Sequence, residues 1–292
     1  MGSAGQRRVA DPGELEEWVR VDDGVRLWTA TAGGGPTSVV LCHGGPGLWD
    51  YLQPVAAMLA DVARVHRWEQ RGCGRSDRTG PYSVARSVAD LEFLRRRFGH
   101  QRWVVAGHSW GAGLALRYAL IHPDRVLGVL YVSGTGFGRA WREAYHREVD
   151  RRLTPRQRRR RDQLKQRQRS AAEEREWRTL TYAPDFADSR HAFALAADFA
   201  DVPHAINFAC NAALNDEEKG TVEADLLTAA CELDVPVRIV HGASDPRPVW
   251  AVQRLAEALP RAELVVLEGV GHLPWLEDPD AFHRTTRGFI TR

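Results

Sequence analysis

The chain has 292 residues, of which 43% are hydrophobic and 27% are charged, and its formal net charge is +2. This length allows one substantial core with a small accessory domain. The small net charge disfavours a nucleic-acid partner, and the lack of an apolar stretch of about 18 residues disfavours a membrane span. Because the first residues show neither a signal-type apolar segment nor a myristoylation pattern, we expect a soluble, cytoplasmic protein.

Strand-like and helix-like segments alternate along most of the chain. This alternation predicts an α/β fold in which helices cover both faces of a mostly parallel sheet. The first elements differ, because 18–21 and 26–30 flank Asp23-Gly24 and predict an antiparallel hairpin. An apolar strand at 38–42 then ends in His43-Gly44-Gly45-Pro46-Gly47. A loop this rich in glycine lets backbone N–H groups approach a reacting carbonyl without obstruction by side chains.

The pentapeptide Gly107-His108-Ser109-Trp110-Gly111 has the pattern G-x-S-x-G. It follows an apolar strand at 103–106 and precedes a helix over 112–120, which is the context of a nucleophile elbow. The tight turn predicts a strained Ser109, and a side chain at either outer glycine would collide with a neighbouring element. The Ser109 hydroxyl would then emerge at the carboxyl edge of the sheet. The alternative, an ordinary loop serine, remains because the pattern also occurs by chance.

The pattern of alternating elements is interrupted after 129–135 and resumes near 234. The segment between is helical, charged and poor in β-branched residues. Within it, Thr154 to Gln157 predict a helix start with a capping box. The arginine run that follows fits a solvated helix face better than a phosphate-binding surface, since arginine is frequent throughout the chain and acidic residues follow at 173–176.

The last part of the chain offers partners for Ser109. A strand at 235–240 leads into a loop with Asp245, and a strand at 262–267 leads into a loop with His272, before helices at 249–259 and 279–290. A serine hydroxyl needs a base, and the base needs an orienting carboxylate. We therefore predict Ser109 as nucleophile, His272 as base and Asp245 as the carboxylate.

Other histidines fit the role of base less well. His241 closes a strand, the His108 side chain should turn away from the oxyanion side, and His283 lies on the last helix. The expected oxyanion-hole donors are the backbone N–H groups of Gly45 and Trp110. Four widely spaced cysteines predict neither a disulfide framework nor a metal site.

The elbow, the glycine loop and the Ser-Asp-His order resemble the α/β-hydrolase superfamily. The segments 43–47, 69–76 and 107–111 resemble, more narrowly, the proline iminopeptidase family. This resemblance implies a cofactor-free serine hydrolase with no metal. It also implies that 136–233 is a helical lid between two parts of the core, 1–135 and 234–292. Two positions depart from the family pattern: Glu69 replaces an aspartate, and Asn207 stands where we look for a lid carboxylate that would hold the substrate's amino group. Other lid carboxylates could serve instead, and the sequence does not select among Asp185, Asp188, Asp198 and Asp201.

Three functions follow as hypotheses. The first is cleavage of an amide after an N-terminal proline or small hydrophobic residue, and the second is hydrolysis of a small-molecule ester or lactone. The third is binding without catalysis, since a fold alone does not prove activity. We expect Trp110 and Asn207 to contact the substrate. A lid carboxylate would favour the first function, and an apolar roof would favour the second, with Trp141, Trp177, Tyr182, Phe186, Phe193, Phe199 and Phe208 as the candidate roof residues. The sequence leaves the natural substrate, the acceptor and the oligomeric state open.

Overall fold

A twisted sheet forms the centre of the computed structural model, which describes residues 13–291. Within these residues the sheet has eight strands in the order β1-β2-β4-β3-β5-β6-β7-β8. β1 pairs antiparallel with β2 and β2 with β4, whereas the remaining pairs are parallel. The predicted hairpin and the mostly parallel sheet are therefore confirmed. The strands are β1 (Leu15–Arg20), β2 (Arg26–Ala32), β3 (Thr37–Cys42), β4 (Ala63–Trp68), β5 (Trp103–His108), β6 (Val126–Val132), β7 (Val237–Gly242) and β8 (Ala262–Leu267).

Helices cover both faces of this sheet. Successive strand residues alternate between two apolar cores, so that Val40 belongs to the core covered by α2, α3 and α10, while Leu41 belongs to the core covered by α1 and α12. This division follows from the two-residue period of a strand buried on both sides. These helices and the short α11 are α1 (Gln53–Leu59), α2 (Val84–Arg97), α3 (Trp110–Ile121), α10 (Val249–Ala258), α11 (Pro274–Glu277) and α12 (Pro279–Ile290).

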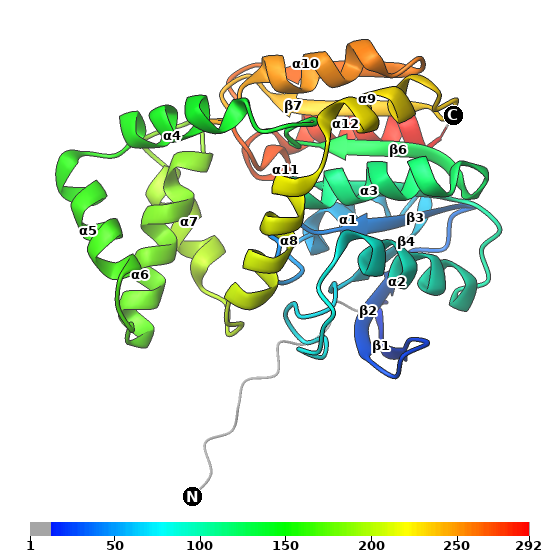
Figure 1. Ribbon diagram of the computed structural model, residues 1–292, viewed down its shortest axis with the longest axis horizontal. Coiled ribbons are helices and arrows are strands. Elements are labelled where there is room, and N and C mark those ends of the chain that lie inside the picture. The colour runs from blue at the N-terminus through cyan, green and yellow to red at the C-terminus, as the bar shows by residue number, and fades with distance from the viewer. Residues whose placement is uncertain (1–12, 292) are drawn as a thin grey trace, which may run out of the picture.

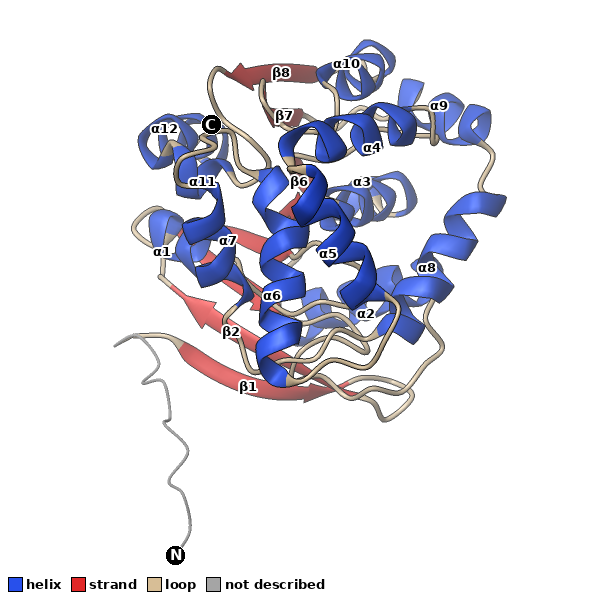
Figure 2. Ribbon diagram, turned by 90° about the vertical axis from the view of Figure 1, so that its left-hand side faces the viewer, coloured by secondary structure: helices blue, strands red, loops and turns tan. Residues whose placement is uncertain are grey.

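The helices α4 to α9 come between β6 and β7, where the sequence predicted an insertion. Figure 1 shows that β6 and β7 point towards the lobe formed by α4, α5, α6 and α7, and that α8 runs along the boundary between this lobe and the core. When the left-hand side of Figure 1 faces the viewer, as in Figure 2, this lobe lies in front of the sheet. The inserted helices α4 to α8 thus lie at the carboxyl edge of the parallel strands, and α9 leads back beside α10 to the start of β7. They are α4 (Trp141–Arg152), α5 (Pro155–Lys165), α6 (Ala171–Tyr182), α7 (Ala192–Ala200), α8 (Phe208–Gly220) and α9 (Glu223–Cys231).

The basic run of the sequence lies on α5. The predicted capping box is present, because Thr154 accepts from the Gln157 backbone and Gln157 accepts from the Thr154 backbone. Arg160 pairs with Glu176 and Arg161 with Asp150. The run is therefore part of an ion-paired helix surface. No helix among the described residues is long and apolar enough to cross a membrane.

His66 on β4 is hydrogen-bonded to His100, which lies between α2 and β5. His66 Nε2 lies 2.8 Å from His100 Nε2, and His66 Nδ1 lies 2.9 Å from the Thr31 hydroxyl. Burial, followed by the charges of His100 and Arg64, lowers the pKa of His66 to about 3 from an ordinary value of 6.5. Between these two pH values the unfolded chain binds a proton that the folded protein does not bind. The free energy of unfolding must therefore rise with pH across this window.

We expect acidification from about pH 7 to pH 5 to remove about 2 kcal/mol of stability through His66. Urea unfolding at several pH values measures this slope, and a His66→Gln variant should show a shallower one because glutamine does not titrate. Equal slopes in the two proteins would contradict the assignment.

Candidate active site

Ser109 occupies the turn between β5 and α3 in a conformation that side chains rarely adopt. Its φ is 57° and its ψ is −121°. A Cβ at Gly107 would lie 2.0 Å from the Gly111 carbonyl oxygen, and a Cβ at Gly111 would lie 2.1 Å from that of Cys42. Both contacts are far shorter than atoms allow, so the two glycines permit the turn. The elbow geometry is thus the one that the sequence predicted.

The glycine loop after β3 lies beside this turn. Gly45 has a left-handed φ of 141°, and its peptide bond to Pro46 is cis. Gly45, Ser109 and Trp110 line the same cavity. Within residues 13–291 the backbone N–H groups of Gly45 and Trp110 have no hydrogen-bond partner. They are therefore free to donate to a ligand, and their role as oxyanion donors stays a prediction.

Asp245 and His272 are brought together at the same edge of the sheet, after β7 and β8. His272 Nδ1 lies 2.6 Å from Asp245 Oδ2, and both side chains are buried. Burial alone would raise the pKa of Asp245, but the charge and hydrogen bond of His272 and the charge of Arg247 hold it well below its usual range. The carboxylate therefore stays ionised and fixes the imidazole with a proton on Nδ1.

Ser109 and His272 come from adjoining loops, but no hydrogen bond joins the serine hydroxyl to the imidazole among the described residues. Such contacts often form only in the substrate complex. The backbone of His272 is fixed by its N–H, which donates to the Asp185 carbonyl at 2.7 Å. Asp185 also pairs with Arg247 at 2.6 Å. The inserted segment therefore helps to hold the loop that carries His272.

A chain of hydrogen bonds connects the glycine loop with the His272 loop through Tyr51 and His108. The Gly44 N–H donates to the Tyr51 hydroxyl at 2.8 Å, and this hydroxyl lies 2.7 Å from His108 Nδ1. His108 Nε2 lies 2.8 Å from the His272 carbonyl oxygen. Burial, then the nearby His272, lowers the pKa of His108 well below its usual range. The neutral ring therefore accepts from Tyr51 and donates to His272, which gives His108 a positioning role.

The other two histidines weighed in the sequence lie away from Ser109. His241 Nε2 lies 2.9 Å from the Arg247 carbonyl oxygen, so His241 supports the loop after β7. His283 is on α12 and is half-buried. Tyr51 and Arg247 were not identified from the sequence, since their contacts depend on segments far apart in the chain.

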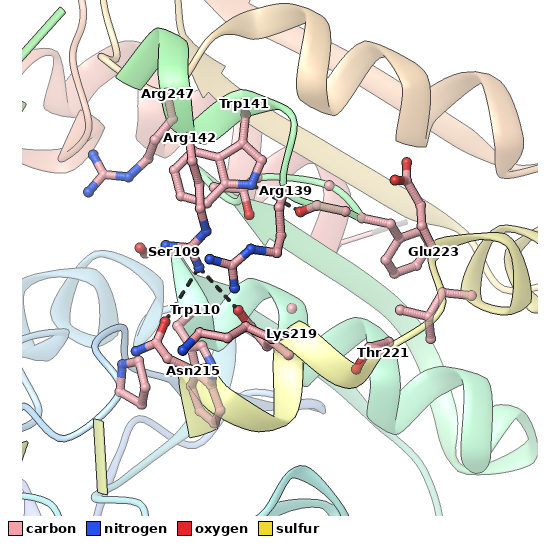
Figure 3. Close-up of a pocket in the computed structure, with 18 of the residues that line it drawn as sticks. Ser109, Trp110, Arg139, Trp141, Arg142, Asn215, Lys219, Thr221, Glu223 and Arg247 are labelled. Carbon is pink, nitrogen blue, oxygen red and sulfur yellow. Dashed lines mark hydrogen bonds and ion pairs between the residues drawn. The ribbon is translucent and has the colours of Figure 1, made fainter. Parts of the chain in front are cut away.

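A cavity of about 450 Å³ opens above Ser109 between the core, α4 and α8. Figure 3 shows Ser109 and Trp110 on one side and the side chains of Arg139, Arg142 and Lys219 directed into the same space. Among the candidate roof residues only Trp141 lines it, so the other six do not form a roof over this cavity. Its charged lining consists of five cationic side chains and two carboxylates, namely Arg117, Arg139, Arg142, Lys219, Arg247, Glu218 and Glu223.

Asn207, which we expected to contact the substrate, lies at the start of α8. Its side chain caps α8 by accepting from the Cys210 N–H at 3.1 Å. Its amide nitrogen donates to the Gly72 carbonyl at 3.0 Å and to the Tyr82 hydroxyl at 3.2 Å. Asn207 is not among the cavity residues. The amide is used to attach α8 to the core, as expected of asparagine at a helix start, and the structure gives no support for a substrate contact.

Two features characterise this chain as a class of protein: the sheet is mostly parallel, and a strained serine turn lies at its carboxyl edge. The chain matches the alpha/beta hydrolase family over residues 39–285, and it belongs to that family.

Within the family, the chain resembles proline iminopeptidases. That of Neisseria gonorrhoeae is 38% identical over 109 residues, which cover 35% of this chain and 34% of that protein. Epoxide hydrolase B of Mycobacterium tuberculosis is 32% identical over 127 residues, which cover 38% of this chain and 36% of that protein. These matches thus span about a third of the curated relatives' length.

Solved structures resemble the chain over nearly its whole length. The meta-cleavage product hydrolase of Pseudomonas fluorescens IP01 has a TM-score of 0.73 at 21% identity and covers 94% of this chain and 97% of its own. The enol-lactonase of Burkholderia xenovorans LB400 has a TM-score of 0.70 at 23% identity, with coverages of 94% and 100%. At these identities the likeness shows the fold alone.

Proposed function

We propose that the protein is a serine hydrolase that forms an acyl-enzyme. His272 Nε2 takes the hydroxyl proton as Ser109 Oγ attacks the substrate carbonyl, and the N–H groups of Gly45 and Trp110 stabilise the oxyanion. His272 then gives the proton to the leaving group, and water releases the acyl group by the same route. The observation that carries this proposal is the ionised Asp245 at 2.6 Å from His272 Nδ1, in the loop beside a strained serine turn.

The charges of the cavity bear on the substrate. Its two carboxylates are already paired, Glu218 with Arg142 at 3.6 Å and Glu223 with Arg254 at 3.3 Å. A substrate with a free N-terminal amine would thus place its ammonium group among cations, where desolvation and repulsion both oppose binding. A small-molecule ester or lactone avoids this cost, and we propose it as the substrate class.

Cleavage of an N-terminal prolyl amide is the second candidate. It is favoured by the likeness to the Neisseria and Saccharolobus solfataricus proline iminopeptidases. For this activity a carboxylate of the cavity would have to leave its arginine and hold the amine. The charge balance of the cavity makes this the weaker candidate.

A paired assay separates the two. We expect a short-chain aryl ester to be cleaved with a kcat/KM at least about tenfold above that of a prolyl arylamide, because the ester has the better leaving group and the amide's ammonium group meets a lining with more cations than carboxylates. Faster cleavage of the amide would reverse the order of the candidates. No cleavage of either by a folded protein would favour a non-catalytic binding protein.

A further inference from the structure

Two arginines with no close carboxylate among the described residues face the cavity of Ser109, one just before α4 and one in its first turn. Arg139 is exposed and has no ion pair within residues 13–291. Arg142 is about three-quarters buried, and its Nη2 has only a carboxylate oxygen of Glu218 at 3.6 Å and the Asn215 side-chain oxygen at 3.4 Å. Its Nε is buried without a hydrogen-bond partner among the described residues. We call these two residues the arginine pair.

The charges of Arg139 and Arg142 repel each other. Burial, followed by the neighbouring Arg139 cation, lowers the pKa of the Arg142 guanidinium, so the two charges oppose each other in a partly dry space. Elsewhere in this arginine-rich chain, buried guanidinium groups have close carboxylates, as Arg71 has Asp90 at 3.0 Å and Arg247 has Asp185 at 2.6 Å. Arg142 therefore lacks the close carboxylate that these buried arginines possess, since its nearest one, on Glu218, is 3.6 Å away.

The backbone places the pair beside the reaction centre. The loop 133–140 follows β6, the strand next to β5, and contains Gly136 and Gly138 with left-handed φ angles of 68° and 78°. Its residues 135–139 line the cavity together with Ser109. Arg139 lies on this loop and Arg142 lies in the first turn of α4. Figure 3 shows both guanidinium groups reaching towards α8, into the space above Ser109.

We propose that the arginine pair binds a carboxylate of the substrate, so that the enzyme hydrolyses esters or lactones that carry a second, ionised carboxyl group. The proposal rests on the proposed hydrolase function and names its substrate class. Guanidinium groups match a carboxylate with two parallel hydrogen bonds, which also orients the scissile carbonyl. Inorganic phosphate is the competing anion, and the binding experiment below distinguishes it from a carboxylate. The carboxylate takes no part in bond making or breaking.

Matched esters test this directly. Mono-4-nitrophenyl succinate carries the charge on the acyl side and 4-acetoxybenzoate carries it on the leaving group, and the methyl ester of each is the neutral partner. We expect one anionic ester to exceed its partner in kcat/KM by about 10- to 100-fold, the range of a charge-assisted hydrogen bond. This ratio should fall towards one in Arg142→Gln and Arg139→Gln, and Arg142→Lys should keep part of it. Arg159→Gln is the matched control and should keep the full ratio, because Arg159 is exposed on α5 and has no ion pair within residues 13–291.

A ratio near one for both pairs in the unmodified protein overturns the inference, and so does a ratio that persists in both glutamine variants. The hydrolase proposal survives either result if cleavage still requires Ser109. If no ester is cleaved, calorimetric titration of the folded Ser109→Ala protein with glutarate decides. Binding that is lost on adding Arg142→Gln supports the anion site, whereas absence of glutarate binding rejects it. Tighter binding of inorganic phosphate than of glutarate would overturn the choice of carboxylate.

Discussion

Replacement of Ser109 by alanine is expected to lower turnover at least about a thousandfold, the scale on which removal of a serine nucleophile acts. Alanine keeps the backbone and removes only the hydroxyl oxygen. Because Ser109 holds a φ of 57°, a small side chain is the substitution least able to disturb the turn. The loss should therefore be confined to chemistry, with kcat falling and the melting temperature nearly constant. A chromogenic aryl ester and a thermal melt measure the two quantities.

Ser189→Ala is the matched control, because Ser189 is exposed in the segment before α7. A fluorophosphonate probe, which reacts with activated serines, should label the unmodified chain and the control but leave Ser109→Ala unlabelled. Turnover near the normal rate in Ser109→Ala would reject the nucleophile, and with it the acyl-enzyme.

The parts of the fold that the sequence predicted well depend on short-range constraints. The elbow follows from the sizes of Gly107 and Gly111, and the hairpin from Asp23-Gly24 between two strands. The helix start at Thr154 follows from a capping box that spans four residues. In each case the residues that define the structure adjoin one another in the chain.

The strand β4 shows why other parts were not predicted. Its sequence Ala-Arg-Val-His-Arg-Trp does not have the pattern of a buried strand, yet Arg67 is 4% exposed. Arg67 is buried because Glu14 lies 2.5 Å away and Asp50 also pairs with it. Partners so far apart in the sequence cannot be read from a hydrophobic pattern.

The candidate active site likewise has parts that the sequence predicted and parts that it did not. Chain order and loop position were enough to select Asp245 and His272, which the structure brings into contact. The charge of the cavity was not predicted, because Arg139 and Arg142 lie just before and in the first turn of α4, whereas Glu218 and Lys219 lie on α8. Only the packing of these segments brings the four side chains together. Asn207 was assigned to the substrate by comparison with a family position, but its local context is a helix cap.

Replacement of Asp245 by asparagine is also expected to lower turnover greatly, and the hydrogen bonds of the Asp245 carboxylate explain why. Asp245 Oδ1 accepts the backbone N–H of Arg247 at 2.8 Å, and Oδ2 accepts the imidazole N–H of His272 at 2.6 Å. An asparagine has one accepting and one donating end. Its donating end cannot face the Arg247 N–H, because two donors would then meet in a buried place. The amide oxygen must therefore take the Oδ1 position, which directs the NH2 group towards His272.

This orientation forces His272 Nδ1 to accept, so that the proton moves to Nε2 and the imidazole can no longer remove the proton of Ser109. We expect kcat to fall about ten-thousandfold, as in other triads where the amide fixes the wrong tautomer. Measurement of ester turnover, with the exposed Asp124→Asn as control, tests this expectation. Loss of less than about tenfold in a folded Asp245→Asn protein would mean that His272 does not depend on this carboxylate. A large loss together with slow but measurable fluorophosphonate labelling of Ser109 would show that the nucleophile is intact and that its base has been disabled, which is the division of roles that the geometry supports.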